Sequence, residues 1–220
     1  MPHSHNMKQI KTILDVVAIA TILLLPHAEL IPFFGYSIPV LLVVWLILKF
    51  GKESFSDLGL SGKLFKPKIV FIGGAFGLLT LAFLQLIFHP LLDFFVSLDS
   101  EDVGLYDTIR SSRIQFLLMV VMGWLIGGLY EEIVFHGFMF TRLERMIKGP
   151  YSTQISFLIT SVLFGLYHIQ LGPLGVVNAL VAGAIYLAVY MRFNRNLWYS
   201  IVCHGCYNTL VMILIYLGYV

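Results

Sequence analysis

Residues 114–140 read IQFLLMVVMGWLIGGLYEEIVFHGFMF. The segment is long enough to cross a bilayer, because a helix needs about 20 apolar residues to span the hydrocarbon. It also contains two adjacent carboxylates, Glu131 and Glu132. An ionisable group inside hydrocarbon costs roughly 2.5–3.5 kcal/mol even on a lenient insertion scale. A membrane segment that keeps two of them side by side is therefore predicted to use them.

The composition of the whole chain is that of a polytopic membrane protein. Of its 220 residues, 59% are hydrophobic and 12% are charged, and the mean hydropathy is +0.89. Soluble domains are nearer half apolar and a quarter charged. Alternating segments of about ten residues, which build membrane β-barrels, do not recur. The sequence thus predicts an all-α transmembrane helical bundle.

Seven apolar runs are candidate membrane spans. The second run is short for a full crossing, and the others approach or exceed the required length. We expect about seven spans, with a buried polar site formed by the C-terminal half of the chain. The runs are residues 12–31, 36–50, 69–96, 114–140, 151–170, 173–193 and 197–218.

Basic residues gather in every second connection between these runs. Lys8 and Lys11 precede the first run, and Arg142, Arg145 and Lys148 follow the fourth. Cytoplasmic loops of membrane proteins have this excess of lysine and arginine. The pattern predicts a cytoplasmic N-terminus, and we expect an integral multi-pass protein of the plasma membrane.

We expect one membrane-embedded domain, residues 11–220, because no linker is long enough to separate two. Residues 1–10 are expected to form a short polar leader that is disordered. The first apolar run continues too far for a cleavable signal and lacks a small-residue cleavage site. Cys203 and Cys206 lie within one apolar run, which argues against a disulfide framework.

Three of the runs place notable side chains four residues apart, a spacing that puts them on one helix face. Any one of these pairs is explained by hydrogen bonding between helices. Their coincidence on three separate runs favours a shared site. The pairs are Glu132 with His136, Phe164 with His168, and His204 with Asn208.

These pairs resemble the three ordered motifs of the CPBP family, also called Abi proteins, which are related to the type II CAAX prenyl endopeptidases. The flanking Phe135 and Gly137, and the Asn-Leu-Trp sequence at residues 196–198, also look like the family. The resemblance covers residues 123–210 and suggests a protease-like core at about 114–218. One position departs from the family: His136 stands where an arginine is usual, and it can neutralise and orient Glu132 only when protonated, or more weakly as a neutral donor.

The resemblance implies hydrolysis of a peptide bond within or beside the membrane, as in the CAAX proteases. Glu131 would be the general base that activates a water molecule. His168 would share that water and protonate the leaving amine. His204 and Asn208 would donate hydrogen bonds to the oxyanion, at about 3–4 kcal/mol per donor.

Two further residues are expected to support these groups. Glu132 would hold His136 and the geometry of its helix, and Phe164 would accompany His168.

Other intramembrane protease designs fit the sequence less well. Asp107 is not followed by Gly-x-Gly-Asp, and the chain has no Gly-x-Ser-x-Gly nucleophile elbow.

A metal is the close alternative to a metal-free site. Glu131, His168 and His204 are a possible ligand set for zinc with a fourth position open for water. The chain lacks the His-Glu-x-x-His sequence of helical zinc sites. A glutamate mechanism without a cofactor is therefore favoured, with zinc as the alternative.

The expected partners are membrane lipid and a peptide or protein substrate, which would be lipidated in one version of this hypothesis. No basic run is dense enough to suggest nucleic acid. Two other functions stay open. A non-catalytic membrane binding protein, of the bacteriocin-immunity or protein-maturation type, would use the cavity to hold a peptide. A transporter would use the polar residues as a proton relay, although repeated halves are not evident.

The predicted spans leave one geometric conflict. Glu131 and His204 fall near the inner side of their runs, whereas His168 falls near the outer end of the fifth. The three side chains meet only if the fifth helix begins later than residue 151 or is strongly tilted.

Overall fold

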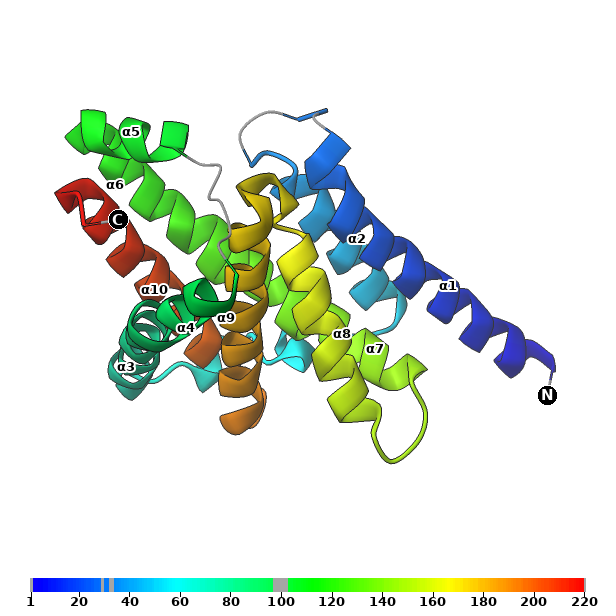
Figure 1. Ribbon diagram of the computed structural model, residues 1–220. Helices are drawn as coiled ribbons and strands as arrows, with labels where there is room; N and C mark the ends of the chain where they lie inside the picture. Colours follow the sequence, from blue (N-terminus) through cyan, green and yellow to red (C-terminus); the bar gives the residue numbers. More distant parts are fainter. Residues whose placement is uncertain (1, 29, 32–33, 97–102, 220) are drawn as a thin grey trace.

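The computed structural model describes residues 2–28, 30–31, 34–96 and 103–219, which form a bundle of helices (Figure 1). Nowhere in these ranges is there a β-strand, so the all-α fold class is confirmed. The α-helices are α1 Pro2–Leu24, α2 Ser37–Phe50, α3 Lys68–Phe83, α4 His89–Phe95, α5 Val103–Ser111, α6 Arg113–Met122, α7 Phe140–Met146, α8 Ser152–Leu166, α9 Gly172–Arg192 and α10 Leu197–Leu217. The 3₁₀ segments are η1 Leu25–Ala28, η2 Phe55–Leu58, η3 Gly62–Leu64 and η6 Ile169–Leu171, and the π-helical ones are η4 Leu84–Phe88 and η5 Gly123–Met139.

The helices account for all seven predicted runs. Two of them, Ser37–Phe50 and Ser152–Leu166, are apolar but shorter than a full crossing. Within the described residues, five other stretches are long and apolar enough to span a bilayer: Gln9–Ala28, Lys68–Phe95, Arg113–Met146, Ile169–Arg192 and Leu197–Leu217. The chain is therefore an integral, multi-pass membrane protein, although the helix in the fifth run is shorter than expected.

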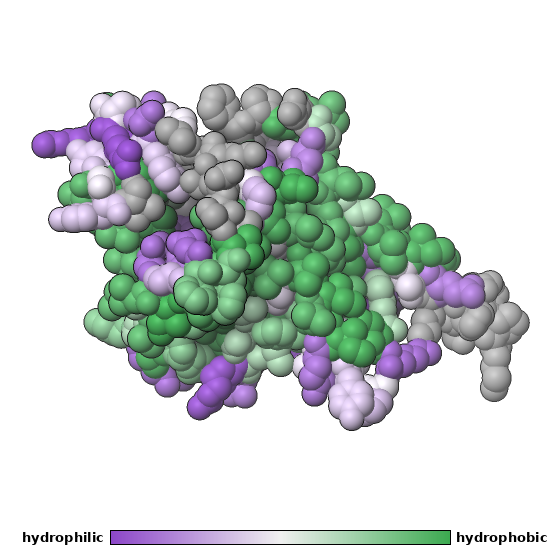
Figure 2. All heavy atoms as spheres, viewed as in Figure 1, coloured by the Kyte–Doolittle hydropathy of each residue, from purple (hydrophilic) through white to green (hydrophobic). Residues whose placement is uncertain are grey.

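The outer surface fits a lipid environment. Apolar side chains cover the middle of the visible face, and hydrophilic groups gather at its upper and lower ends (Figure 2). Phe71, Leu86 and Phe94 are 78%, 75% and 82% exposed. So much exposed apolar surface marks a membrane or protein contact rather than a face in water. In a bilayer these side chains contact acyl chains.

The first helix includes the N-terminal segment, whose assignment as a separate polar leader stays a prediction. Helix α1 begins at Pro2 and extends along one edge of the bundle, so residues 2–10 are helical (Figure 1). Proline is tolerated in the first turn of a helix, and no glycine or further proline interrupts the sequence before Leu24. The single domain over residues 11–220 stays a prediction.

The fourth run continues further than predicted. Helical backbone extends without a break from Arg113 through α6, η5 and α7 to Met146, beyond the expected end at residue 140. The first strong helix breakers after it are Gly149, with a positive φ of 118°, and Pro150. Helix α8 then runs back from Ser152 beside α7 and η5.

This longer helix removes the predicted conflict of depth. Glu131 precedes the turn at 147–151 by nearly as many residues as His168 follows it. Because the two helices run in opposite directions from that turn, the two side chains reach the same level. The fifth helix begins only one residue later than expected, at Ser152, so a late start is not what brings them together.

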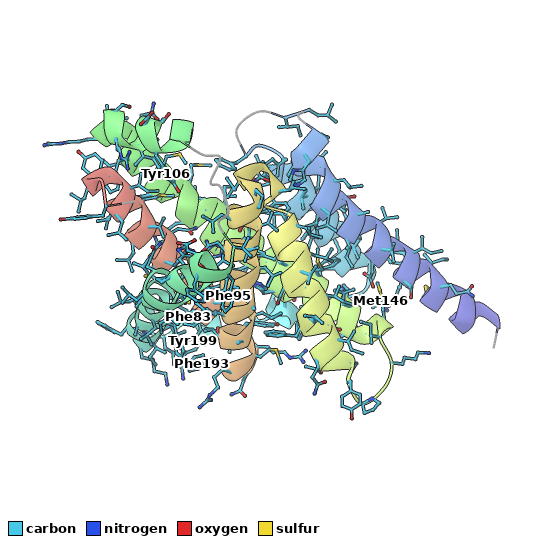
Figure 3. All side chains as sticks on the ribbon, viewed as in Figure 1. Phe83, Phe95, Tyr106, Met146, Phe193 and Tyr199 are labelled. Atoms are coloured by element: carbon cyan, nitrogen blue, oxygen red, sulfur yellow. The ribbon has the colours of Figure 1, made fainter. Side chains whose placement is uncertain are left out.

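Helix α10 packs closely against α3 on one side and η5 on the other. A Cβ atom added to Gly73 would lie 2.8 Å from Val202 Cβ, and one added to Gly77 would lie 2.6 Å from the carbonyl oxygen of Cys203. These two glycines on α3 therefore permit close helix packing. Just before and just after the start of α10, Phe193 and Tyr199 stack with ring centroids 3.9 Å apart (Figure 3).

A network of charged side chains ties α7 to α1 and to the loop after α2. Arg142 Nη2 and Arg145 Nη1 each donate to the carboxylate of Glu53 at 2.6 Å. Arg142 Nε lies 3.3 Å from Asp15 Oδ1, and the guanidinium is almost fully buried. Each oxygen of the Glu53 carboxylate thus accepts from a different arginine, and such charge-assisted hydrogen bonds are strong.

We expect Glu53→Gln to lower the melting temperature of the protein in detergent at pH 7. Burial raises the pKa of Glu53, but the hydrogen bonds from Arg142 and Arg145 outweigh this, so its pKa lies below its ordinary value. A carboxylate with a lowered folded pKa stabilises the fold above its unfolded pKa, and that stability is lost as the pH falls through the folded value. The acid decline in melting temperature should therefore be shallower in the variant. Asp93→Asn, at an exposed carboxylate, is the matched control, and an unchanged acid decline in Glu53→Gln would contradict the assignment.

Candidate active site

The second of the paired carboxylates binds two histidines. Glu132 Oε2 accepts from His136 Nδ1 at 2.8 Å, and Glu132 Oε1 accepts from His204 Nδ1 at 3.0 Å. Glu132 and His136 are fully buried. The bond to His136 follows from the four-residue spacing, whereas the bond to His204 joins η5 to α10 across the bundle.

His168 is positioned by the end of α8. The helix stops at Leu166, so carbonyl groups of its last turn have no helical N–H partner. His168 Nδ1 lies 2.8 Å from one of these, the carbonyl oxygen of Phe164. The main chain thus sets the orientation of the imidazole ring.

Glu131 lies between two imidazole rings. Its Oε2 is 3.8 Å from His168 Nε2 and 3.9 Å from His204 Nε2, and the residue is 6% exposed. These separations are too long for direct hydrogen bonds. They suit polar groups that share one water molecule.

Hydrogen bonding determines which ring nitrogens are protonated. His168 Nδ1 faces a carbonyl oxygen and His204 Nδ1 faces a carboxylate, so each Nδ1 carries a hydrogen. In a neutral ring the other nitrogen, Nε2, is then an acceptor. Both Nε2 atoms point toward Glu131, so three acceptor atoms converge where a donor such as water is required.

Aromatic rings hold the histidines in place. The ring centroid of Phe164 lies 4.9 Å from that of His168 and 5.4 Å from that of His136. Tyr186 of α9 stacks on His204 with centroids 4.3 Å apart and an interplanar angle of 20°. Sequence reasoning missed Tyr186, because it and Tyr190, four residues further on, are aromatic side chains in an apolar run and were not counted among the residues that need a polar partner.

A second group of aromatic residues was also missed. Tyr167 Oη donates to Tyr36 Oη at 3.2 Å, and the rings of Tyr36 and Tyr130 lie 5.9 Å apart. The only available sequence signal was position, because Tyr130 and Tyr167 directly precede Glu131 and His168 in the chain.

Asn208 lies one turn beyond His204 on α10. Its Nδ2 donates to the carbonyl oxygen of Gly123 at 3.2 Å. A carboxamide nitrogen has two hydrogens, so this bond orients the group and leaves one hydrogen for another acceptor.

The start of α10 is also well defined, since the side chain of Asn196 caps the helix by accepting from Trp198 N at 3.2 Å.

The departure from the family motif has a visible consequence. His136 makes one bond to Glu132 through Nδ1, and among the described residues its buried Nε2 has no hydrogen-bond partner. An arginine has five donor hydrogens. The histidine therefore orients Glu132 with fewer bonds, and His204 supplies the second one.

The two imidazoles and Glu131 share one feature with zinc sites and differ from them in spacing. Both imidazoles donate Nδ1–H to a carboxylate or carbonyl, which is the usual second-shell pattern of zinc-bound histidine. Tetrahedral ligands at zinc lie about 3.3 Å apart, given bonds of about 2.0 Å, whereas the separations from Glu131 are 3.8 and 3.9 Å. In the described part of the chain no cluster of three His, Cys, Asp or Glu side chains has metal-binding geometry. The residues as placed do not fit zinc, and a metal-free site stays a prediction.

The structure brings all seven predicted site residues into one neighbourhood. Their catalytic roles stay predictions, because proximity alone does not identify chemistry. The carboxylates and histidines form the centre, and Phe164 and Asn208 border it. The seven are Glu131, Glu132, His136, Phe164, His168, His204 and Asn208.

Part of the chain is similar to known proteins. Residues 113–210 match the model of the family described as "Type II CAAX prenyl endopeptidase Rce1-like". The matched residues include all three motifs, so the resemblance predicted from them is confirmed for that part of the chain.

A curated relative points the same way. The chain is 32% identical over 97 residues to "Putative membrane peptidase YdiL" of Bacillus subtilis (strain 168), a match that covers 44% of this chain and 37% of the relative. The chain thus aligns with just over a third of that protein's length. No solved structure matches the chain.

Proposed function

From the similarity of residues 113–210 to the type II CAAX prenyl endopeptidases, we propose that the protein is an intramembrane endopeptidase. It would hydrolyse a peptide bond in a membrane-associated protein or peptide. The observation that supports this most is the convergence of Glu131, His168 and His204 from three helices on one buried position. A carboxylate and the Nε2 acceptor of a neutral His168 around one point suit the activation of water, and His204 borders the same point.

In the proposed reaction Glu131 removes a proton from a water molecule that His168 Nε2 also holds. The water oxygen attacks the carbonyl carbon of the substrate. When the C–N bond breaks, His168 relays the proton to the leaving amine. Glu131 makes no direct bond to either imidazole, so its carboxylate is free to accept this proton.

The developing oxyanion would be stabilised from α10. Asn208 has a hydrogen left after its bond to Gly123. His204 donates from Nε2 only as an imidazolium, because its Nδ1 already bonds Glu132. The ionised carboxylate of Glu132 stabilises that cation, so Glu132 would act through His204. Preorganised donors of this kind contribute about 2.7–4 kcal/mol each.

The direct test is cleavage of defined peptides by the purified protein in detergent or nanodiscs. Lipidated and unlipidated versions of each peptide are incubated, and the products are identified by mass spectrometry. The proposal expects cleavage at a defined bond. A membrane binding protein would instead retain the peptide intact, and retention without product from any peptide would reject the proposal in favour of that alternative.

The preference for a metal-free site gives a separate prediction. Protein washed with a strong chelator is expected to keep its activity, because the ligand atoms stand farther apart than zinc requires. Metal content by elemental mass spectrometry and cleavage rate are measured on the same sample. Loss of activity on chelation, with recovery on adding zinc, would show that Glu131, His168 and His204 close around a metal.

We further propose that the N-terminus is cytoplasmic and that the membrane is the plasma membrane. Lys11, Arg142 and Arg145 line one cavity of about 200 Å³. Basic residues from two separate connections therefore lie on the same side of the bundle, as cytoplasmic residues do.

A further inference from the structure

Gly127 lies where the helix of the paired glutamates faces the proposed oxyanion donors. It precedes Glu131 by four residues on η5. A Cβ atom built on Gly127 would overlap Asn208 Nδ2 and lie 3.0 Å from His204 Nε2. The two polar atoms that the mechanism assigns to the oxyanion therefore contact the bare backbone of the helix that contains the base.

A second glycine on the same helix contacts Asn208. The carbonyl oxygen of Gly123 accepts the bond from Asn208 Nδ2 at 3.2 Å. A Cβ on Gly123 would lie 3.3 Å from Asn208 Cβ and 3.7 Å from Asn208 Nδ2. Gly123 thus orients the carboxamide, and Gly127 leaves the space in which it lies.

We propose that Gly127 is a positioning residue, which sets the distance between the base Glu131 and the oxyanion donors His204 and Asn208. Any side chain at this position displaces the imidazole and the carboxamide from the positions in which they would contact the oxyanion. This inference rests on the proposed function. Oxyanion donors act only when they lie about 2.7–3.1 Å from the developing charge, so a small displacement has a large effect on rate.

The main test is Gly127→Ala in the full-length protein. The variant is expected to lower kcat at least about tenfold with KM little changed, because the lost interaction exists only in the transition state. Gly74→Ala is the matched control. It adds a methyl group to another glycine that packs against α10, but that Cβ meets only Cys206 Sγ, at 3.6 Å, and the rate should not change.

A double-mutant cycle distinguishes positioning from a general loss of structure. Asn208→Ala is expected to lower kcat in the wild type by about 10²–10³-fold, and by clearly less when Gly127→Ala is already present. Two substitutions that act through the same group are not additive. Losses that add fully would overturn the proposal.

A graded variant keeps the proposal testable if Gly127→Ala does not fold. Gly123→Ala places its methyl group farther from Asn208 Nδ2, so it should give a smaller loss of kcat that also disappears in the Asn208→Ala background. Failure of the proposed function would appear differently. In that case the wild type and every variant cleave nothing, whereas wild-type cleavage with an unaffected Gly127→Ala rejects this inference alone.

Discussion

Glu131→Gln is expected to lower kcat for peptide cleavage by about 10²–10⁴-fold, the usual contribution of a general base. The amide has nearly the same shape but cannot accept the proton of the attacking water. The carboxylate makes no direct bond to the two nearest imidazoles, at 3.8 and 3.9 Å, so the substitution leaves those side chains in place. Cleavage rate is measured on the purified variant together with its melting temperature, which should change little.

The control for this prediction is Glu144→Gln. Glu144 is also a partly buried carboxylate, but it pairs with Arg195 at 2.8 Å outside the site. Its loss should lower the melting temperature slightly and leave kcat near the wild-type value. Retained cleavage in Glu131→Gln would remove Glu131 from the role of base, whatever the other variants show.

Glu132→Gln should have the second largest effect, and it should act on both stability and rate. A carboxylate accepts hydrogen bonds from both imidazoles at once. In the amide, one of the two acceptor oxygens becomes an NH₂ group, so one of the two Nδ1–H groups loses its acceptor. Buried hydrogen bonds to a charged group contribute about 1.5–3 kcal/mol each. Glu132 is fully buried, so water cannot replace the lost acceptor. The variant should melt several degrees lower.

The rate should also fall, because His204 loses the group that holds its ring and stabilises its charged form. The two glutamate variants therefore differ in kind: Glu131→Gln loses rate alone, and Glu132→Gln loses rate and stability. Parallel melting and kinetic measurements separate them. An unchanged melting temperature in Glu132→Gln would mean that the bond to His204 does not hold η5 to α10.

Much of the fold follows from local sequence. The apolar runs predict helices because only helices satisfy the backbone inside lipid, and seven helices lie where the runs predict them. The boundaries were less certain. The helix that contains the glutamates extends to Met146, because helix-forming residues continue past the apolar run and hydropathy does not detect them.

The members of the site were also visible in the sequence, as polar side chains at four-residue spacing in apolar runs. Their partners were not. Glu132 was expected to hold His136, yet it also binds His204 from a helix more than sixty residues away. Tyr186 and Gly127 have no motif of their own, and only packing against His204 and Asn208 reveals them.

The sequence by itself determined a helical membrane protein and the residues that are costly to keep in lipid, because hydrophobicity and helix periodicity are local properties of the chain. The tertiary structure decided how those residues meet. Glu131 and His168 reach one level because their helices run in opposite directions from a shared turn, and α10 approaches them because glycines on α3 and η5 leave room for it. Depth and close approach depend on how whole helices pack, which no local pattern specifies.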